Sequence, residues 1–469
     1  MGSSLKKQGE RGETAPGPAA ETTVQGDLDG GYAWIILLSA FTMCGLTFGV
    51  IKSFGVFYVE IHRYFDTTAT TVSWITSITL ATIHVSGPLS SALSARFGHR
   101  SIVMIGGLLC SIGVISGSFA RNLLELYLTT GFLNGLGYSL AWTPTVTMVG
   151  LYFDRKRPMA NALSSSGECV LMFVISPLTQ WLIDSYTWRG AMLIVGALQL
   201  NLCICGALLR PLENSQQYSH PKEVTANEEE KMLRNQSQSL HKEDKNTLKS
   251  KILHYLDFTL IANAKFMLYA MFGLFAAMGL FAPALFLVPY ARSRGVEEYQ
   301  SAALMSISSA LDLIGRVGFG WVANMRIIKT LYQLIATVIV LGVVVLLCPL
   351  ASTFSELVIF SAAFGLVYGA TLTVHITVLA EVVGVHRLGS ALGFAMLIRS
   401  CGGLLGPPIA GFFIDHMGDY GAGFLMAGAA FLISSLFLIL LALINYKDQG
   451  SGLKAKPSHN VEEEEAEVA

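Results

Sequence analysis

The chain has 469 residues, of which 52% are hydrophobic and only 13% charged, with a formal net charge of −1 and a mean hydropathy of +0.54. Soluble globular domains usually carry about 25% charged residues, so this composition predicts a membrane protein with several spans. No block of basic residues offers a footprint for nucleic acid, and we expect no nucleic-acid partner.

Twelve apolar stretches follow one another along the chain, and about 20 apolar residues are enough to cross a bilayer as a helix. They lie at about 32–59, 71–94, 101–120, 123–150, 158–182, 189–209, 264–290, 299–323, 329–350, 356–382, 388–414 and 421–446. Six precede a long polar segment and six follow it. The pattern predicts an all-α membrane protein with twelve transmembrane helices in two six-helix bundles.

The polar segments divide the chain into five expected parts. These are a disordered tail at 1–30, an N-terminal six-helix bundle at 31–210, a linker at 211–262, a C-terminal six-helix bundle at 263–446 and an acidic tail at 447–469. One set of loops is the richer in basic residues and contains Arg96, Arg100, Arg155, Lys156, Arg157, Arg326, Lys329 and Arg387. Cytoplasmic loops carry the excess of lysine and arginine, so both tails and the linker, which share that side, are expected in the cytoplasm.

A pair of opposite charges lies in the middle of the eighth stretch. Asp312 and Arg316 are four residues apart and so share one face of a helix. A charge at the bilayer centre costs at least about 2.5–3.5 kcal/mol. Two interpretations are open: a buried ion pair that holds helices together, or a pair on a water-filled path, where the Arg316 guanidinium binds an anionic substrate through two parallel hydrogen bonds.

Other classes of protein are disfavoured by what the sequence lacks. It contains no Gly-x4-Gly-Lys-Ser/Thr run, which disfavours transport driven by ATP. It also contains no clustered nucleophile and base and no set of metal ligands, so we expect no enzyme, no cofactor and no metal.

Two motifs stand at predicted helix starts. The first stretch opens with Asp29–Trp34 (DGGYAW) and the fifth with Tyr152–Ala162 (YFDRKRPMANA). They resemble the signatures of the monocarboxylate transporter family within the major facilitator superfamily, and the likeness covers nearly all twelve stretches. The runs Ser166–Cys169, Leu256–Leu260 and His375–Ile376 resemble most the monocarboxylate transporter 7 branch.

The resemblance implies a major facilitator fold in the plasma membrane and secondary transport of a small monocarboxylate. It also implies a proton as candidate co-substrate, the lipid bilayer as environment and a single-span ancillary glycoprotein as candidate partner. Ketone bodies and lactate- or pyruvate-like anions are the expected cargo, with proton-linked symport and facilitated diffusion both open. The alternatives are a carrier of another small solute (taurine, creatine or an amino-acid-like compound) without proton coupling, or a transport-inactive receptor or scaffold.

The resemblance also implies roles for individual residues. Lys52 matches the family's lysine that accepts the transported proton and then attracts the carboxylate. From the residue alone, a lysine that snorkels to the outer interface is the alternative. Asp312 and Arg316 match the family's eighth-helix pair, which implies a proton or charge relay for Asp312 and carboxylate binding for Arg316.

Arg157 and Asn161 match the start of the family's fifth helix. For Arg157, an inner gate and a simple cytoplasmic charge bias are both open. Asn161 either bonds across helices or contacts substrate. In the tenth stretch, Phe364 and Tyr368 are candidates for an aromatic specificity residue.

Three further polar residues lie inside apolar stretches. His375 is either hydrogen-bonded structure or part of a polar cavity that contacts substrate. Arg399 either pairs with Glu168 or adds a second positive charge for the substrate.

Overall fold

The structure is a computed structural model that describes residues 30–153, 156–210, 260, 262–325, 328–384 and 388–454. Within these ranges every regular element is a helix. The predicted linker at 211–262 lies almost wholly outside the described residues, as do nearly all of the predicted N-terminal tail and most of the C-terminal one. The last helix continues to Lys454, past the predicted end of the bundle at 446.

The described residues of the N-terminal half form eleven helical elements. They are α1 (Ala33–Cys44), η1 (Gly45–Gly49), α2 (Val50–Phe65), α3 (Ala69–Val85), α4 (Gly87–Phe97), α5 (His99–Ser118), α6 (Leu123–Leu126), η2 (Tyr127–Leu133), α7 (Asn134–Tyr152), α8 (Arg157–Gln199) and α9 (Asn201–Leu208). Several join end to end into longer rods, and α8 turns a corner at Thr187 (φ 63°). The half therefore contains six rods: 33–65, 69–97, 99–118, 123–152, the first arm of α8, and its second arm with α9.

The C-terminal half has longer, less interrupted helices. They are α11 (Ala264–Ser293), α12 (Glu298–Asn324), α13 (Thr330–Leu347), η5 (Cys348–Leu350), α14 (Phe354–Val383), α15 (Leu388–Met417) and α16 (Gly421–Lys454). The sequence specifies their starts locally. The Asn263 side chain accepts hydrogen bonds from two backbone N–H groups of α11, and Thr353 with Glu356 forms a capping box at the start of α14.

Nine helices of the described residues are long and apolar enough to cross a membrane, against twelve predicted stretches. The two arms joined at Thr187 form one continuous candidate, Met159–Leu208. The rod at 69–97 is divided at Ser86 into two shorter helices. The rod at 123–152 is not among the nine because it is less apolar, being rich in glycine, threonine and tyrosine. The twelve rods are present within the described residues.

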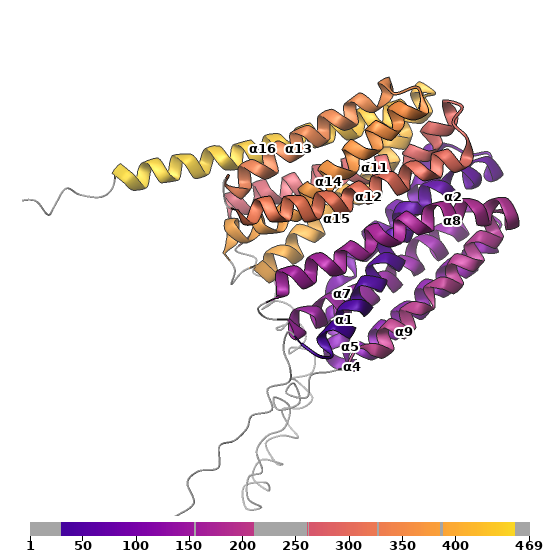
Figure 1. Ribbon diagram of the computed structural model, residues 1–469, viewed down its shortest axis with the longest axis horizontal. Coiled ribbons are helices and arrows are strands. Elements are labelled where there is room, and N and C mark those ends of the chain that lie inside the picture. The colour runs from indigo at the N-terminus through magenta and orange to yellow at the C-terminus, as the bar shows by residue number, and fades with distance from the viewer. Residues whose placement is uncertain are drawn as a thin grey trace, which may run out of the picture.

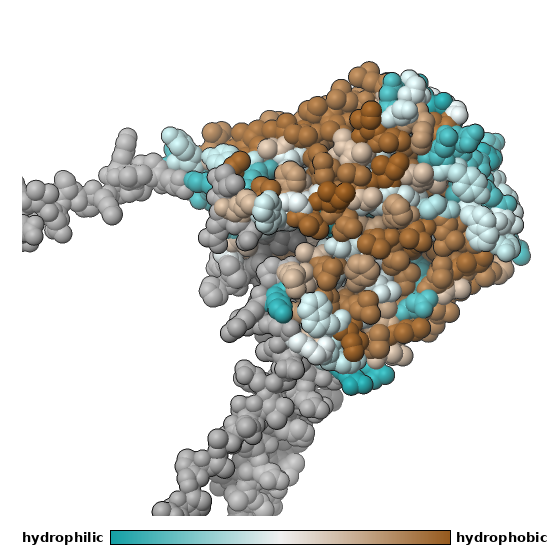
Figure 2. All heavy atoms as spheres, viewed as in Figure 1, coloured by the Kyte–Doolittle hydropathy of each residue, from teal (hydrophilic) through white to brown (hydrophobic). Residues whose placement is uncertain are grey.

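The flanks of the molecule are apolar. Large hydrophobic side chains such as Leu38 (61% exposed), Val317 (67%) and Ile359 (69%) point outward. Figure 2 shows hydrophobic side chains over the visible flank and hydrophilic ones gathered at the right-hand end. An apolar flank between polar ends suits a surface that contacts hydrocarbon rather than water.

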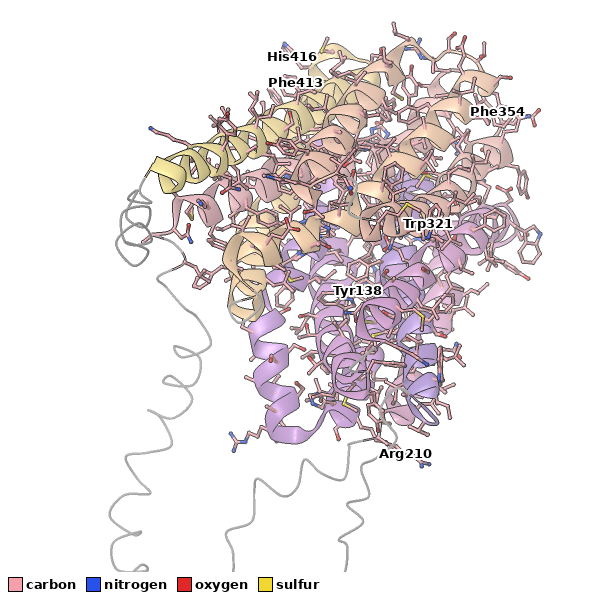
Figure 3. The ribbon with its side chains drawn as sticks, turned by 60° about the vertical axis from the view of Figure 1, so that its left-hand side comes forward. Tyr138, Arg210, Trp321, Phe354, Phe413 and His416 are labelled. Carbon is pink, nitrogen blue, oxygen red and sulfur yellow. The ribbon has the colours of Figure 1, made fainter. Side chains whose placement is uncertain are left out.

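The rods run between two faces. We call the terminal face the one where α9 ends at Leu208, α11 begins at Ala264 and α16 ends, and we call the opposite one the far face. Arg210 lies at the terminal face, whereas Phe354 and His416 lie at the far face (Figure 3).

The two halves pack against each other through three pairs of helices. In Figure 1 the N-terminal half, in indigo to magenta, lies beside the C-terminal half, in orange to yellow. The contacts are α2 with α11, α3 with α15 and α8 with α12. A Cβ on Gly411 would lie 2.7 Å from the Thr70 Cα, and one on Gly55 would lie 2.8 Å from the Ala284 oxygen. Glycine at these positions lets helices of different halves approach closely.

Polar contacts join the halves at the far face. The Asp415 carboxylate of α15 accepts hydrogen bonds from the backbone N–H groups of Ala69 (2.7 Å) and Thr70 (2.9 Å). It thereby caps the first turn of α3, where free N–H groups and the helix dipole favour an anion. Nearby, Arg292 of α11 pairs with Glu60 of α2 at 3.0 Å.

Hydrogen bonds between the two halves also reach the middle of the molecule. There Arg316 Nη1 donates to the Ser165 carbonyl at 3.1 Å. The halves are thus held together at the far face and at the centre.

Candidate functional site

Lys52 lies in α2 at the centre of the molecule, and its side chain is only 11% exposed. Its Nζ is 2.5 Å from Glu168 Oε1 and 3.8 Å from Asp312 Oδ2. It also lies 4.3 Å from the centroid of the Tyr368 ring, a cation–π distance. Lys52 therefore does not snorkel to an interface; it contacts α8 of its own half and α12 and α14 of the other.

Arg316 lies on α12 and meets three acceptors. Its Nε and Nη2 donate to the two Asp312 oxygens at 2.8 and 3.0 Å, as the four-residue spacing predicts. Its Nη2 also donates to Glu168 Oε2 at 3.3 Å, and its Nη1 to the Ser165 carbonyl. The predicted ion pair exists and also reaches across to α8 of the N-terminal half.

We call Lys52, Glu168, Asp312 and Arg316 the central cluster. Its side chains are 5–12% exposed, and it contains two cations and two carboxylates. Buried charges persist only when they are paired and hydrogen-bonded. Glu168 makes the pairing complete, because one oxygen contacts Lys52 and the other contacts Arg316.

An aromatic stack on α14 borders the central cluster. The Phe364 and Tyr368 rings are stacked with centroids 5.9 Å apart, and both side chains are buried. The next residue, Gly369, lies so close to α12 that a Cβ there would overlap the Asp312 carbonyl oxygen. Of the two predicted aromatic residues, Tyr368 is the one in contact with Lys52.

Other predicted site residues lie apart from the central cluster. The Asn161 side chain is exposed, and its carbonyl accepts a hydrogen bond from Ser164 Oγ. His375 is half-buried; its Nδ1 lies 2.7 Å from the Leu372 carbonyl, so Nδ1–H donates. The Arg157 side chain, a candidate gate, is outside the part that the structure describes.

Arg399 belongs to a second group of polar residues. It acts electrostatically on His84, His375 and Tyr269, and the Tyr269 hydroxyl donates to the His375 carbonyl at 2.8 Å. We call these four residues the second basic cluster. Of the two possibilities left open for Arg399, the structure does not show the pairing with Glu168, which contacts Lys52 and Arg316 instead.

The helix register explains why Arg399 acts on His84. Helices α3 and α15 run antiparallel, with Gly411 opposite Thr70 near the far face and Gly403 opposite Leu80 nearer the centre. One further turn along each helix places His84 of α3 and Arg399 of α15 at the same level. Within the described ranges no carboxylate lies within ion-pair distance of Arg399.

A small cavity of about 30 Å³ lies inside the N-terminal half, away from both clusters. Three polar atoms of residues that line it, Thr76 Oγ1, Thr130 Oγ1 and Asn134 Oδ1, have no hydrogen-bond partner. A buried water needs roughly 10–15 Å³ and polar partners. The cavity suits water and is too small for an organic substrate. No group of residues that could hold a metal ion occurs among the described side chains.

Four residues of these clusters are not among the predicted site residues. Glu168 and Arg399 stand out in the sequence as charged residues inside apolar stretches, whereas His84 and Tyr269 were missed. In each case the available signal is an ionisable side chain within a stretch long enough to span a bilayer, which is a functional candidate by default.

Comparison with known proteins agrees with this architecture. The family model described as Major Facilitator Superfamily matches residues 36–344 and 333–465. The chain is 37% identical over 421 residues to monocarboxylate transporter 2 of Homo sapiens, covering 89% of this chain and 87% of the relative. It is also 37% identical to monocarboxylate transporter 13 of Bos taurus (88% and 90% covered) and 36% identical to monocarboxylate transporter 12 of Mus musculus (89% and 86%).

The fold and these matches define a membrane transporter rather than an enzyme. The chain belongs to the monocarboxylate transporter family of the major facilitator superfamily. The predicted fold class, with two six-helix bundles, is thereby confirmed.

Proposed function

We propose that this protein carries small monocarboxylates across the plasma membrane, with Lys52 and Arg316 as the cations that bind the carboxylate. One observation supports this above the others: the two cations come from different halves and meet in a single buried cluster through Glu168. Sites of this kind, between two bundles that rock about them, are how secondary transporters work. The names of the relatives point to the same class of cargo.

The remaining candidates have supporting roles in this proposal. Tyr368 and Phe364 form the apolar wall beside the carboxylate and select the organic part of the substrate. Asn161 and His375 lie nearer the terminal face and contact substrate on its way out. Arg157, at the start of α8, gates that exit. The terminal face is the cytoplasmic one, as its basic loops predict.

We further propose that a proton accompanies the anion, with Lys52 and Asp312, 3.8 Å apart, as the pair that shares it. The central cluster holds two positive and two negative charges and is neutral, so a bound monoanion leaves one negative charge. Moving such a charge against the membrane potential costs about 2.3 kcal/mol per 100 mV. A co-transported proton removes that cost.

A second candidate function is transport of a zwitterionic, amino-acid-like solute. Glu168 and Asp312 provide two carboxylates beside the cations, and an ammonium group on the substrate would pair with one of them. Such a solute brings its own positive charge, so its uptake would need no proton.

Uptake by proteoliposomes containing the full-length carrier tests the proposal. We expect uptake of labelled L-lactate, pyruvate or 3-hydroxybutyrate to increase as the outside pH falls from 8 to 6. Lys52→Gln should abolish uptake, because the central cluster then carries an excess negative charge. Monocarboxylate uptake with a flat pH profile would contradict proton coupling, and uptake of taurine or an amino acid alone would favour the second candidate.

A further inference from the structure

Glu168 lies where a bound monocarboxylate would have to lie. Its Oε1 is 2.5 Å from Lys52 Nζ and its Oε2 is 3.3 Å from Arg316 Nη2. One carboxylate thus spans the two cations that, in the proposed function, hold the carboxylate of the substrate. We propose that Glu168 competes with the substrate for these cations and, when the substrate displaces it, is the final acceptor of the co-transported proton that Lys52 and Asp312 pass on.

The donors of Arg316 show why the two carboxylates compete. A guanidinium has five N–H groups, and four of them are engaged: two by Asp312, one by Glu168 and one by the Ser165 carbonyl. A carboxylate that binds bidentately needs two parallel donors. The substrate carboxylate gains a second N–H donor from Arg316 only when Glu168 releases Nη2. The substrate then also replaces Glu168 as the partner of Lys52.

Glu168 is the carboxylate that can be released. Asp312 is fixed by two hydrogen bonds from Arg316 on its own helix, one turn away. Glu168 is on α8 of the N-terminal half, and its bond to Arg316 crosses to the C-terminal half. A rocking motion of the halves therefore breaks the Glu168–Arg316 contact and leaves the Asp312–Arg316 contact intact.

The proton follows from the charge of the displaced carboxylate. Other titratable groups that face Glu168 are Lys52, Arg316, Asp312, Tyr368, Cys44 and Cys169. A carboxylate that has lost both cations in a buried site is stabilised by protonation. One proton from water on the loading side binds a Glu168 oxygen as the anion binds Lys52 and Arg316. It returns to water on the opposite side as the anion leaves and Glu168 again contacts both cations.

This inference rests on the proposed function, and Glu168→Gln in the full-length carrier tests it. For the wild type, the apparent KM should rise with pH, by up to about tenfold per unit for one linked proton. For Glu168→Gln we expect a KM below that of the wild type at pH 7.5 and less than about twofold variation between pH 6 and 8. Uptake should also become sensitive to membrane potential, because the empty cluster is now positive.

A matched control variant separates a specific role of Glu168 from the general loss of a carboxylate. Glu381→Gln, which neutralises an exposed carboxylate on α14, should keep the wild-type KM and pH profile. The inference is refuted if Glu168→Gln keeps the wild-type pH slope and stays insensitive to potential. If the variant does not transport, calorimetric binding of the same anion decides: tighter, pH-independent binding supports the inference, and absent or wild-type-like binding contradicts it. If the wild type carries no monocarboxylate, the proposed function fails, and this inference with it.

Discussion

The central cluster and the second basic cluster both lie between helices of the two halves, but only in the central cluster are the cations paired with carboxylates. In the central cluster Lys52 and Arg316 face two carboxylates at 2.5–3.8 Å. In the second basic cluster Arg399 acts electrostatically on two imidazoles and a phenol, with no carboxylate within ion-pair distance among the described residues.

This difference in pairing predicts which cluster depends on the carboxylates of this chain for its stability. Removing one member of a closed network of buried ion pairs destabilises the protein, because it leaves an opposite charge buried without its partner. An uncompensated cation must instead be solvated by water or meet a mobile anion. Arg399 is half-buried and lies one turn beyond the level of Leu80 and Gly403, towards the terminal face, so we expect water to reach it.

The largest effect that separates the clusters concerns stability. Arg316→Met would leave Glu168 and Asp312 with Lys52 as their only cation in the cluster, at a cost of about 3–5 kcal/mol. Arg399→Met removes a charge with no carboxylate partner, and we expect no loss of stability. The measurement is thermal unfolding of both purified variants in detergent, with Arg121→Met, which removes an exposed arginine, as control. Equal losses for Arg316→Met and Arg399→Met would show that Arg399 is as tightly paired as Arg316.

The sequence predicted the C-terminal part of the central cluster well. The four-residue spacing of Asp312 and Arg316 within an apolar stretch was enough to predict their contact, because helix geometry alone places both on one face. That Lys52 belongs beside them came from the resemblance. Spacing carries no such information, since only the packing of the two halves brings Lys52 to Asp312 and Arg316.

The role of Glu168 shows where prediction from one sequence stops. Its presence in a membrane stretch was visible, but both Arg316 and Arg399 were available as partners. Only the register of α8 with α12, and of α3 with α15, decides that Glu168 contacts Arg316 while Arg399 lies at the level of His84. The helix count differed partly for a more local reason: Ser86 divides one rod and the corner at Thr187 leaves two arms in one helix, neither of which hydropathy reveals.

A smaller effect concerns the shape of the Arg316 side chain. Arg316→Lys keeps the charge but replaces a planar fork with a point charge, so the parallel hydrogen bonds to Asp312 and the bond to Ser165 cannot all form. We expect uptake to fall at least about tenfold, the equivalent of one charge-assisted hydrogen bond. Uptake is measured at matched surface expression. Near-normal transport would remove Arg316 as the group that clamps the carboxylate.

The smallest effect is expected at the far face, where a carboxylate caps a helix of the other half instead of pairing with a cation. Asp415→Asn keeps an acceptor for the first turn of α3 but loses the charge that favours the helix N-terminus. A loss of about 1–2 kcal/mol makes local opening roughly 5–30 times more frequent. Hydrogen exchange at Ala69 and Thr70 should speed up by that factor, while the capping box of Thr353 and Glu356 at the start of α14 serves as an internal control. Unchanged exchange at Ala69 and Thr70 would mean that the apolar packing of α3 against α15, rather than this carboxylate, holds the far face closed.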